Sequence, residues 1–287
     1  MTAHRPRRSA LYMPASNARA IEKARTLPCD VVVLDLEDAV APEAKAEARA
    51  LAVEAVRSGG FGRREVVIRV NGLDTPWGAA DLGAVGACGA DAVLTPKVAR
   101  PEDLAATAAH LGGGTRLWAM IETGAAIFQL DALGRAAKAC RTDVWIVGPN
   151  DLVKEMRCRP GPDRAPLLPV LSLAVLAAHA HGLEILDGVY NDIPDLAGLE
   201  RECAQGATLG MDGKTLIHPT QVEAANRAFS PTPEAVDWAR AIAAAFAAAE
   251  NAGKGVLKVD GKMVERLHLA EAERVVAVAE AIAALEG

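Results

Sequence analysis

Three acidic residues at the end of one apolar run are the first candidates for a catalytic or cation-binding site in this chain. Residues 31–38 read Val-Val-Val-Leu-Asp-Leu-Glu-Asp, so Asp35, Glu37 and Asp38 end a β-branched stretch that is typical of a buried parallel strand. Like charges at this spacing repel each other. We therefore expect a cation, a catalytic proton or basic side chains beside them.

Other charged and polar side chains follow later apolar runs in the same way. They are Arg69, Asn71, Lys97, Glu122, Asp151, Asp187 and Lys214. In a barrel of parallel strands, the carboxyl ends of all strands share one face, so residues far apart in sequence can converge there. The pattern predicts one site at that face, with the acids of residues 35–38 in it.

Glu122 and Asp151 follow two consecutive strands, so their carboxylates can approach one ion from adjacent positions. Two oxygen ligands with room for water and substrate favour Mg2+ over Zn2+. Arg69 would stabilise an oxygen that gains negative charge, and metal plus arginine suits aldol or Claisen chemistry on 2-keto acids. A Schiff base at Lys97 or Lys214 is the metal-free alternative.

The elements that would position these residues alternate between short strands and helices. We expect eight strands, at residues 10–13, 31–36, 66–70, 92–94, 117–121, 144–147, 184–186 and 208–210. This order predicts an α/β fold, a (β/α)8 barrel, over residues 1–230, with a doubly wound open sheet as the alternative. Residues 231–287 predict an appendage of helix, hairpin and helix, whose apolar faces would pack on a neighbouring subunit.

Composition narrows the class of protein. Of the 287 residues, 51% are hydrophobic and 24% charged, which is typical of a globular protein with a large core, and the net charge of -6 argues against a nucleic-acid partner. Five widely spaced cysteines predict a reduced, cytoplasmic protein. No secretory signal or membrane span is expected, because no apolar run is long enough.

The motifs together resemble one family. They are Arg8-Ser9-x-Leu11-x-x-Pro14, residues 34–40 (Leu-Asp-Leu-Glu-Asp-Ala-Val), Lys45 with Ala48-Arg49, Arg69-Val70-Asn71, Pro96-Lys97-Val98, Ile121-Glu122-Thr123, Gly148 with Asp151-Leu152, and Gly213-Lys214 with Ile217-His218-Pro219-x-Gln221. Over nearly the whole chain this set is similar to the citrate lyase beta subunit family. That family includes malyl-CoA and citramalyl-CoA lyases and is related to the HpcH/HpaI aldolases.

The resemblance implies a barrel that assembles as a homotrimer or hexamer. It implies that Glu122 and Asp151 hold Mg2+, that Arg69 binds the keto-acid oxygen, and that Asp35 and Glu37 support the waters on the metal. Pro96 and Lys97 are expected to contact the substrate. Arg8, in the basic amino-terminal arm, is a candidate for binding the phosphates of coenzyme A.

The appendage carries a departure from the family. Stand-alone CoA-ester lyases supply a catalytic Asp to a neighbouring subunit from a Gly-x-Met-[Ile/Val]-Asp motif, whereas here residues 261–264 are followed by Glu265. Asn150 is a second departure, because an acid commonly precedes the metal-binding Asp. Glu265 would then protonate the product enolate with a side chain that is one methylene longer.

The expected function is Mg2+-dependent carbon-carbon cleavage of a malyl-CoA or citramalyl-CoA type thioester. The products would be acetyl-CoA or a homologue and a 2-keto acid such as pyruvate, glyoxylate or oxaloacetate, and the reverse condensation is also open. The alternatives are an aldolase that acts on free hydroxy-keto acids and a non-catalytic member that binds a keto acid or CoA ester.

Overall fold

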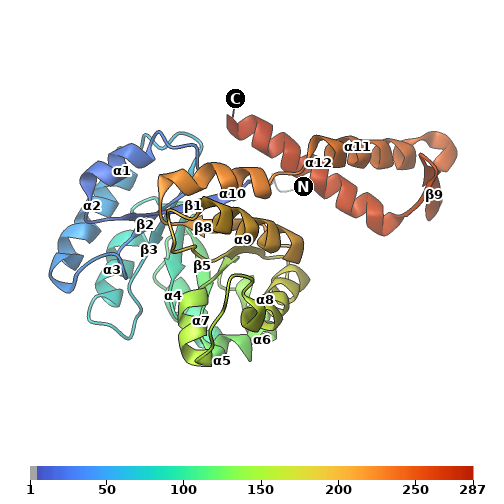
Figure 1. Cartoon of the computed structure of the whole chain (residues 1–287). Coiled ribbons are helices and arrows are strands. Elements are labelled where there is room, and N and C mark those ends of the chain that lie inside the picture. Colours follow the sequence, from blue (N-terminus) through green and yellow to red (C-terminus); the bar gives the residue numbers. More distant parts are fainter. Residues whose placement is uncertain (1–4, 287) are drawn as a thin grey trace. The chain divides into compact units, whose positions relative to one another are not determined.

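Eight parallel strands close into a barrel within residues 7–229 of the computed structural model, which describes residues 5–286 (Figure 1). The strands are β1 (Ser9–Pro14), β2 (Val31–Asp35), β3 (Glu65–Arg69), β4 (Ala92–Thr95), β5 (Arg116–Ile121), β6 (Thr142–Val147), β7 (Glu184–Asp187) and β8 (Gly213–Leu216). Each strand pairs in parallel with the next, and β8 pairs with β1. This closure confirms the predicted (β/α)8 barrel and excludes the open sheet.

Helices follow the strands and surround the barrel (Figure 1). They are α1 (Ala18–Ala24), η1 (Pro42–Ala44), α2 (Lys45–Ser58), α3 (Gly78–Val85), α4 (Pro101–Ala108), α5 (Gly124–Ile127), α6 (Leu130–Ala137), α7 (Pro149–Met156), η2 (Ala165–Leu167), α8 (Leu168–Ala180), α9 (Leu196–Leu209), η3 (Pro219–Gln221) and α10 (Val222–Ala228). Local sequence explains several starts. Asn17 caps α1 by accepting a hydrogen bond from the Ala20 amide, and a proline opens α4 and α7.

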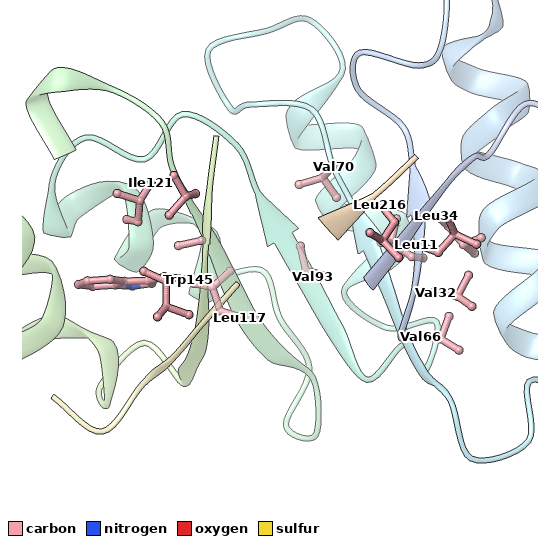
Figure 2. Close-up of a cluster of buried hydrophobic side chains, with 14 of the residues drawn as sticks. Leu11, Val32, Leu34, Val66, Val70, Val93, Leu117, Ile121, Trp145 and Leu216 are labelled. Carbon is pink, nitrogen blue, oxygen red and sulfur yellow. The ribbon is translucent and has the colours of Figure 1, made fainter. Parts of the chain in front are cut away.

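Strand residues alternate between two buried layers. One layer packs between the barrel and its helices and includes Leu11, Val32, Leu34 and Trp145 (Figure 2). The other fills the interior of the barrel, with members such as Val31, Val33 and Trp118. Because successive side chains of a strand point to opposite faces, this alternation also decides which strand-end residues face the interior and which face the helices.

The eighth strand is not where the sequence placed it. Residues 208 and 209 end α9, and Gly210 caps that helix in the left-handed conformation with a φ of 95°. The strand begins at Gly213 and contains Lys214, which is completely buried. A charged residue inside a four-residue strand hid the strand from a search for apolar runs.

Lys214 is tolerated there because buried acids surround it. Its Nζ donates to Asp187 Oδ2 at 3.0 Å, to Glu202 Oε1 at 2.7 Å and to the Gly188 carbonyl oxygen at 2.6 Å. Arg164 Nη1 donates to both oxygens of the same Asp187 carboxylate. The network therefore ties β7, β8, α9 and the loop before α8 together beneath the helices.

Among the described residues, the second unit comprises 230–286 together with 5–6. It contains α11 (Pro233–Ala247), η4 (Ala249–Asn251), β9 (Val256–Val259), β10 (Lys262–Glu265) and α12 (Arg266–Glu286). The antiparallel hairpin turns at Asp260 and Gly261, both with positive φ, as the Asp-Gly pair predicts. Ile242, Val259 and Val264 help form a small core of its own.

No helix between residues 5 and 286 combines the length and the apolar character that crossing a bilayer requires.

Replacing Lys214 by methionine tests the buried network. The change leaves the Asp187 and Glu202 carboxylates without their ammonium partner, and we expect it to lower the free energy of unfolding by about 3–5 kcal/mol in urea titrations. Arg227→Met removes the exposed ion pair with Glu200 and should cost less than about 1 kcal/mol. Equal losses in the two variants would contradict this account.

Candidate active site

A cavity of about 300 Å³ opens at the carboxyl ends of the strands. We call it the mouth cavity. Its lining includes Tyr12, Asp35, Arg69, Glu122, Asp151 and Thr215, which come from β1, β2, β3, the end of β5, α7 and β8. The structure thus brings together Asp35, Arg69, Glu122 and Asp151, which the sequence nominated, whereas Asn71 lies outside the lining and donates to Asp81. This is the convergence that a closed parallel barrel predicts.

Arg69 lies in the wall of the mouth cavity and is held by acids. Its Nε and Nη2 each donate to one oxygen of Asp35 at 2.7 Å, and its Nη1 lies 2.7 Å from Glu37 Oε2. Asp35 is 1% exposed, and its two oxygens also accept the backbone N–H groups of Glu37 and Ala39. The bidentate pair therefore fixes both the guanidinium and the turn after β2.

Basic side chains offset the electrostatic repulsion among Asp35, Glu37 and Asp38. Lys97 Nζ donates to Glu37 Oε1 at 3.0 Å, and Lys45 Nζ donates to the carbonyl oxygens of Leu36 and Glu37. Burial and the nearby Asp38 charge raise the pKa of Glu37, while Arg69 and Lys97 oppose that rise. Asp35 and Glu37 are thus committed to side-chain cations, which was one of the three expectations for this cluster.

Glu122 is the buried carboxylate of the mouth cavity, with 3% of its surface exposed. Its Oε1 accepts the Lys97 backbone N–H at 2.7 Å, and Lys97 adopts a left-handed φ of 52° to present that amide. Gly148 is required beside it, because an added Cβ would lie 2.5 Å from Glu122 Oε2. Burial, together with the charges of Glu37 and Asp151, raises the pKa of Glu122 to about 7.

Asp151 reaches the same cavity from the first turn of α7. Pro149 opens this helix directly after Gly148, so the chain turns sharply from β6 into the helix and brings Asp151 to the rim. Within residues 5–286 the Asp151 carboxylate has no hydrogen-bond or ion-pair partner. The neighbouring Asn150 accepts a hydrogen bond from Asn191 Nδ2 at 2.9 Å.

These two acids fit a magnesium ion. Glu122 Oε2 and both oxygens of Asp151 accept no hydrogen bond within the described chain, and both residues line one cavity. Burial first, and then the charges of Glu37 and Asp151, raise the pKa of Glu122, and a divalent cation would neutralise the negative charge of these carboxylates. No cluster of three His, Cys, Asp or Glu residues suited to a metal occurs between residues 5 and 286. A pair of carboxylates completed by waters and substrate oxygens is a common arrangement for Mg2+.

The two candidate lysines are not suited to a Schiff base. Although burial lowers it, the pKa of Lys97 is raised by Glu37, and the pKa of Lys214 is raised by Asp187 and Glu202. Both amines are therefore protonated near neutral pH and poor nucleophiles. Lys214 and Asp187 also lie outside the mouth cavity, because their strand positions face the helices.

Two other expectations for site residues, those for Arg8 and for Pro96 with Lys97, do not match their observed places, whereas the expectation for Glu265 stays a prediction. Arg8 lies before β1, at the opposite end of the barrel, where its Nε and Nη2 donate to the Asp30 carboxylate at 2.9 Å; only 4% of it is exposed. This buried ion pair is incompatible with a role in binding phosphates. Pro96 is buried outside the cavity lining, and Lys97 contributes through its backbone amide to Glu122. Glu265 is an exposed residue of the second unit.

Sequence reasoning missed several residues that line the cavity. They are Tyr12, Met120, Asn191 and Thr215. Tyr12 continues the inward series of β1 after Ala10, and Met120 continues that of β5 after Trp118. The signal that could have identified them is an inward position near the end of a strand. The residues named from the sequence were instead charged or polar residues that directly follow apolar runs.

Comparison with known proteins identifies the family. The family model described as HpcH/HpaI aldolase/citrate lyase matches residues 8–219. The chain belongs to this family. A second model, described as C-C bond lyase of the TIM-barrel fold, matches residues 165–283 and extends the likeness into the second unit.

Relatives within the HpcH/HpaI aldolase/citrate lyase family carry two kinds of name. A (3S)-malyl-CoA thioesterase of Cereibacter sphaeroides is 50% identical over 279 residues, which covers 97% of this chain and 96% of the relative. The citrate lyase subunit beta of Escherichia coli is 34% identical over 271 residues, with 91% and 89% covered. The family is therefore one of enzymes, and its named relatives differ in reaction.

Solved structures of family members contain small acids and magnesium. The CitE protein of Mycobacterium tuberculosis in complex with magnesium, acetoacetate and coenzyme A is 29% identical, with a TM-score of 0.74 over 95% of this chain and 97% of that one. A citrate lyase beta subunit of the same organism, complexed with oxaloacetate and magnesium, is also 29% identical, with a TM-score of 0.67 over 80% of this chain and 100% of that one.

The raised pKa of Glu122 predicts an effect on stability. In metal-free buffer the folded protein holds this proton up to about pH 7, whereas the ordinary pKa is 4.5. The contribution of Glu122 to the free energy of unfolding is complete below pH 4.5 and is lost as the pH rises through 7, a fall of roughly 3 kcal/mol.

Glu122→Gln should remove this fall and make the protein more stable than the wild type at pH 8 without metal. Urea titrations between pH 5 and pH 8 measure the difference. The matched change at the exposed Glu43, Glu43→Gln, should leave the pH profile as it is in the wild type. A Glu122→Gln profile parallel to that of the wild type would refute the raised pKa.

Proposed function

We propose that this protein is a magnesium-dependent enzyme that acts on a malyl-CoA-type thioester, with the hydroxy-acid end of the substrate in the mouth cavity. The observation that carries the proposal is that Glu122 and Asp151 line one cavity together with Arg69. Both acids have carboxylate oxygens that accept no hydrogen bond from residues 5–286. A volume of about 300 Å³ suits a small organic acid better than a whole CoA ester. The coenzyme portion would therefore extend out of the cavity.

Each residue has a defined task in this proposal. Glu122 and Asp151 would hold Mg2+, which supplies positive charge for the oxygens of the bound acid. Arg69 adds a second fixed positive charge in the cavity wall, and its bidentate bond to Asp35 keeps it oriented without substrate. Lys97 positions Glu122 through its backbone amide.

The relatives support both the metal and the class of ligand. Solved family members contain magnesium with acetoacetate and coenzyme A, or with oxaloacetate, and both acids carry an oxygen near a carboxylate. A structure of CitE with magnesium and pyruvate, 30% identical to this chain, extends the series to a three-carbon acid. We expect pyruvate, glyoxylate or oxaloacetate to bind here in the same chemical manner.

Two reactions are open to a bound malyl-CoA. Hydrolysis adds water across the thioester and yields malate and free coenzyme A, whereas carbon-carbon cleavage yields acetyl-CoA and glyoxylate. We propose hydrolysis as the net reaction, because the relatives at 50% identity over nearly the whole chain are named (3S)-malyl-CoA thioesterases. Carbon-carbon cleavage is the second candidate, supported by the aldolases and lyases that name the family.

Glu265 gives the second unit a part in the proposed function. This residue ends β10, and Met263 beside it has 73% of its surface exposed, so the hairpin presents both an acid and an apolar side chain to a partner. We propose that the second unit caps the mouth cavity of a neighbouring copy in a homotrimer or hexamer and that Glu265 transfers protons there. Sedimentation velocity measures the number of subunits.

An assay of products with and without Mg2+ tests the proposed function. With (3S)-malyl-CoA and Mg2+ we expect malate and free coenzyme A, and kcat/KM should fall by at least about 100-fold in EDTA, in Glu122→Ala and in Asp151→Ala. Thiol release is followed with a disulfide reagent, and malate, glyoxylate and acetyl-CoA are quantified by chromatography. The control variant Asp131→Ala removes an exposed surface acid and should keep full activity.

Acetyl-CoA and glyoxylate as the only products would establish carbon-carbon cleavage in place of hydrolysis. Turnover of free 4-hydroxy-2-keto acids without coenzyme A would establish the aldolase alternative. Full activity of Glu122→Ala would refute the metal site, and binding without any turnover would establish the non-catalytic alternative.

Glu265→Asp tests the part that this side chain takes in the choice of reaction. Shortening the acid by one methylene gives the residue that the lyases carry, so we expect the yield of acetyl-CoA relative to malate to rise. The two products are measured in one reaction mixture. An unchanged ratio, with Glu265→Gln as active as the wild type, would remove Glu265 from the mechanism.

A further inference from the structure

Tyr12 lines the mouth cavity and carries an unusual hydroxyl group. The residue continues the inward series of β1, and its ring lies against the interior cluster of the barrel. The guanidinium carbon of Arg69 lies 4.9 Å from the centre of the ring. The hydroxyl oxygen is buried and has no hydrogen-bond partner among residues 5–286.

The charges of three carboxylates act on this hydroxyl, and none of them accepts a hydrogen bond from it among residues 5–286. Both oxygens of Asp35 are bound by Arg69, and Glu122 Oε1 is bound by the Lys97 amide. Burial, and after it the charges of Asp35, Glu122 and Glu37, raise the pKa of Tyr12 against the opposing effect of Arg69. The group is therefore a neutral hydrogen-bond donor near neutral pH.

An unpaired buried hydroxyl destabilises a folded protein, and phenylalanine would fill the same space without that cost. The packing of the ring on Arg69 does not explain the hydroxyl, because phenylalanine offers the same ring face. The hydroxyl and the ligand-binding groups share one cavity: Tyr12, Arg69, Glu122 and Asp151 all line it. A donor held ready for a ligand oxygen accounts for the whole arrangement.

We propose that Tyr12 is a substrate-binding residue whose hydroxyl donates a hydrogen bond to an oxygen of the 2-keto or 2-hydroxy acid end of the substrate. This inference rests on the proposed function, because it places the acid in the mouth cavity. Glu122, Asp151 and Arg69 provide charge for the acid, whereas Tyr12 provides a directional neutral donor from the cavity lining. Such a donor selects acids that place an oxygen above it.

Tyr12→Phe tests the inference by two independent measurements. Without ligand, the variant should melt about 2–4 °C higher than the wild type, because it lacks the unpaired hydroxyl. In saturating Mg2+, its affinity for pyruvate and for oxaloacetate, measured by calorimetric titration, should fall by roughly 10-fold to 100-fold. Its affinity for Mg2+ alone should stay within about twofold of the wild type, since the metal-binding carboxylates are untouched.

The chain's other tyrosine supplies a matched control. Tyr190 donates its hydroxyl hydrogen to Asp195 at 2.7 Å and does not line the mouth cavity. Tyr190→Phe should lower or leave unchanged the melting temperature and keep the affinity for both acids. It thereby separates loss of a hydroxyl as such from loss of this hydroxyl.

The outcomes distinguish this inference from the proposed function. If the wild type binds neither acid in Mg2+, the proposed function is wrong and the assignment of Tyr12 is lost with it. If the wild type binds and Tyr12→Phe binds equally well, only the assignment is overturned. A lower melting temperature of the ligand-free variant would also overturn it, because the hydroxyl would then have a partner in the free protein.

Discussion

The alternation of side chains along the strands of a closed barrel governs this site. Inward positions at the ends of strands share one small volume, whereas outward positions face the helices and meet different partners. Asp35, Arg69 and Glu122 belong to the inward series and line the mouth cavity. Asp187 and Lys214 belong to the outward series and form a buried ionic network instead. A shift of one residue along a strand would therefore move a side chain from the mouth cavity to the face that packs on the helices.

Within the cavity, electrostatic pairing divides the acids into two groups. Asp35 and Glu37 are neutralised by Arg69 and Lys97, so they hold the turn after β2 and orient the arginine. Glu122 and Asp151 keep oxygens that accept no hydrogen bond from residues 5–286, and a divalent cation would neutralise their negative charge. Burial, together with the charges of Glu37 and Asp151, raises the pKa of Glu122 to about 7.

Backbone geometry fixes the positions of the two carboxylates of the site, Glu122 and Asp151. The left-handed conformation of Lys97 aims its amide at Glu122, and Gly148 leaves the space that the same carboxylate occupies. Pro149 then starts the helix that carries Asp151. The left-handed Lys97, the absence of a side chain at Gly148 and the start of α7 therefore fix the positions of the two carboxylates. Tyr12 lines the same cavity, where we propose that it is a neutral donor.

The sequence by itself determined the barrel, seven of its eight strands and the pairing of Glu122 with Asp151, because apolar runs, their spacing and strand-end acids are local patterns. It misplaced the eighth strand, since the buried Lys214 interrupts the pattern that defines a strand. Only the tertiary structure showed that Arg8 lies away from the mouth cavity and that Tyr12 lines it. A sequence shows which residues carry charge, but the partner that neutralises each charge comes from another strand, and folding alone decides which partner that is.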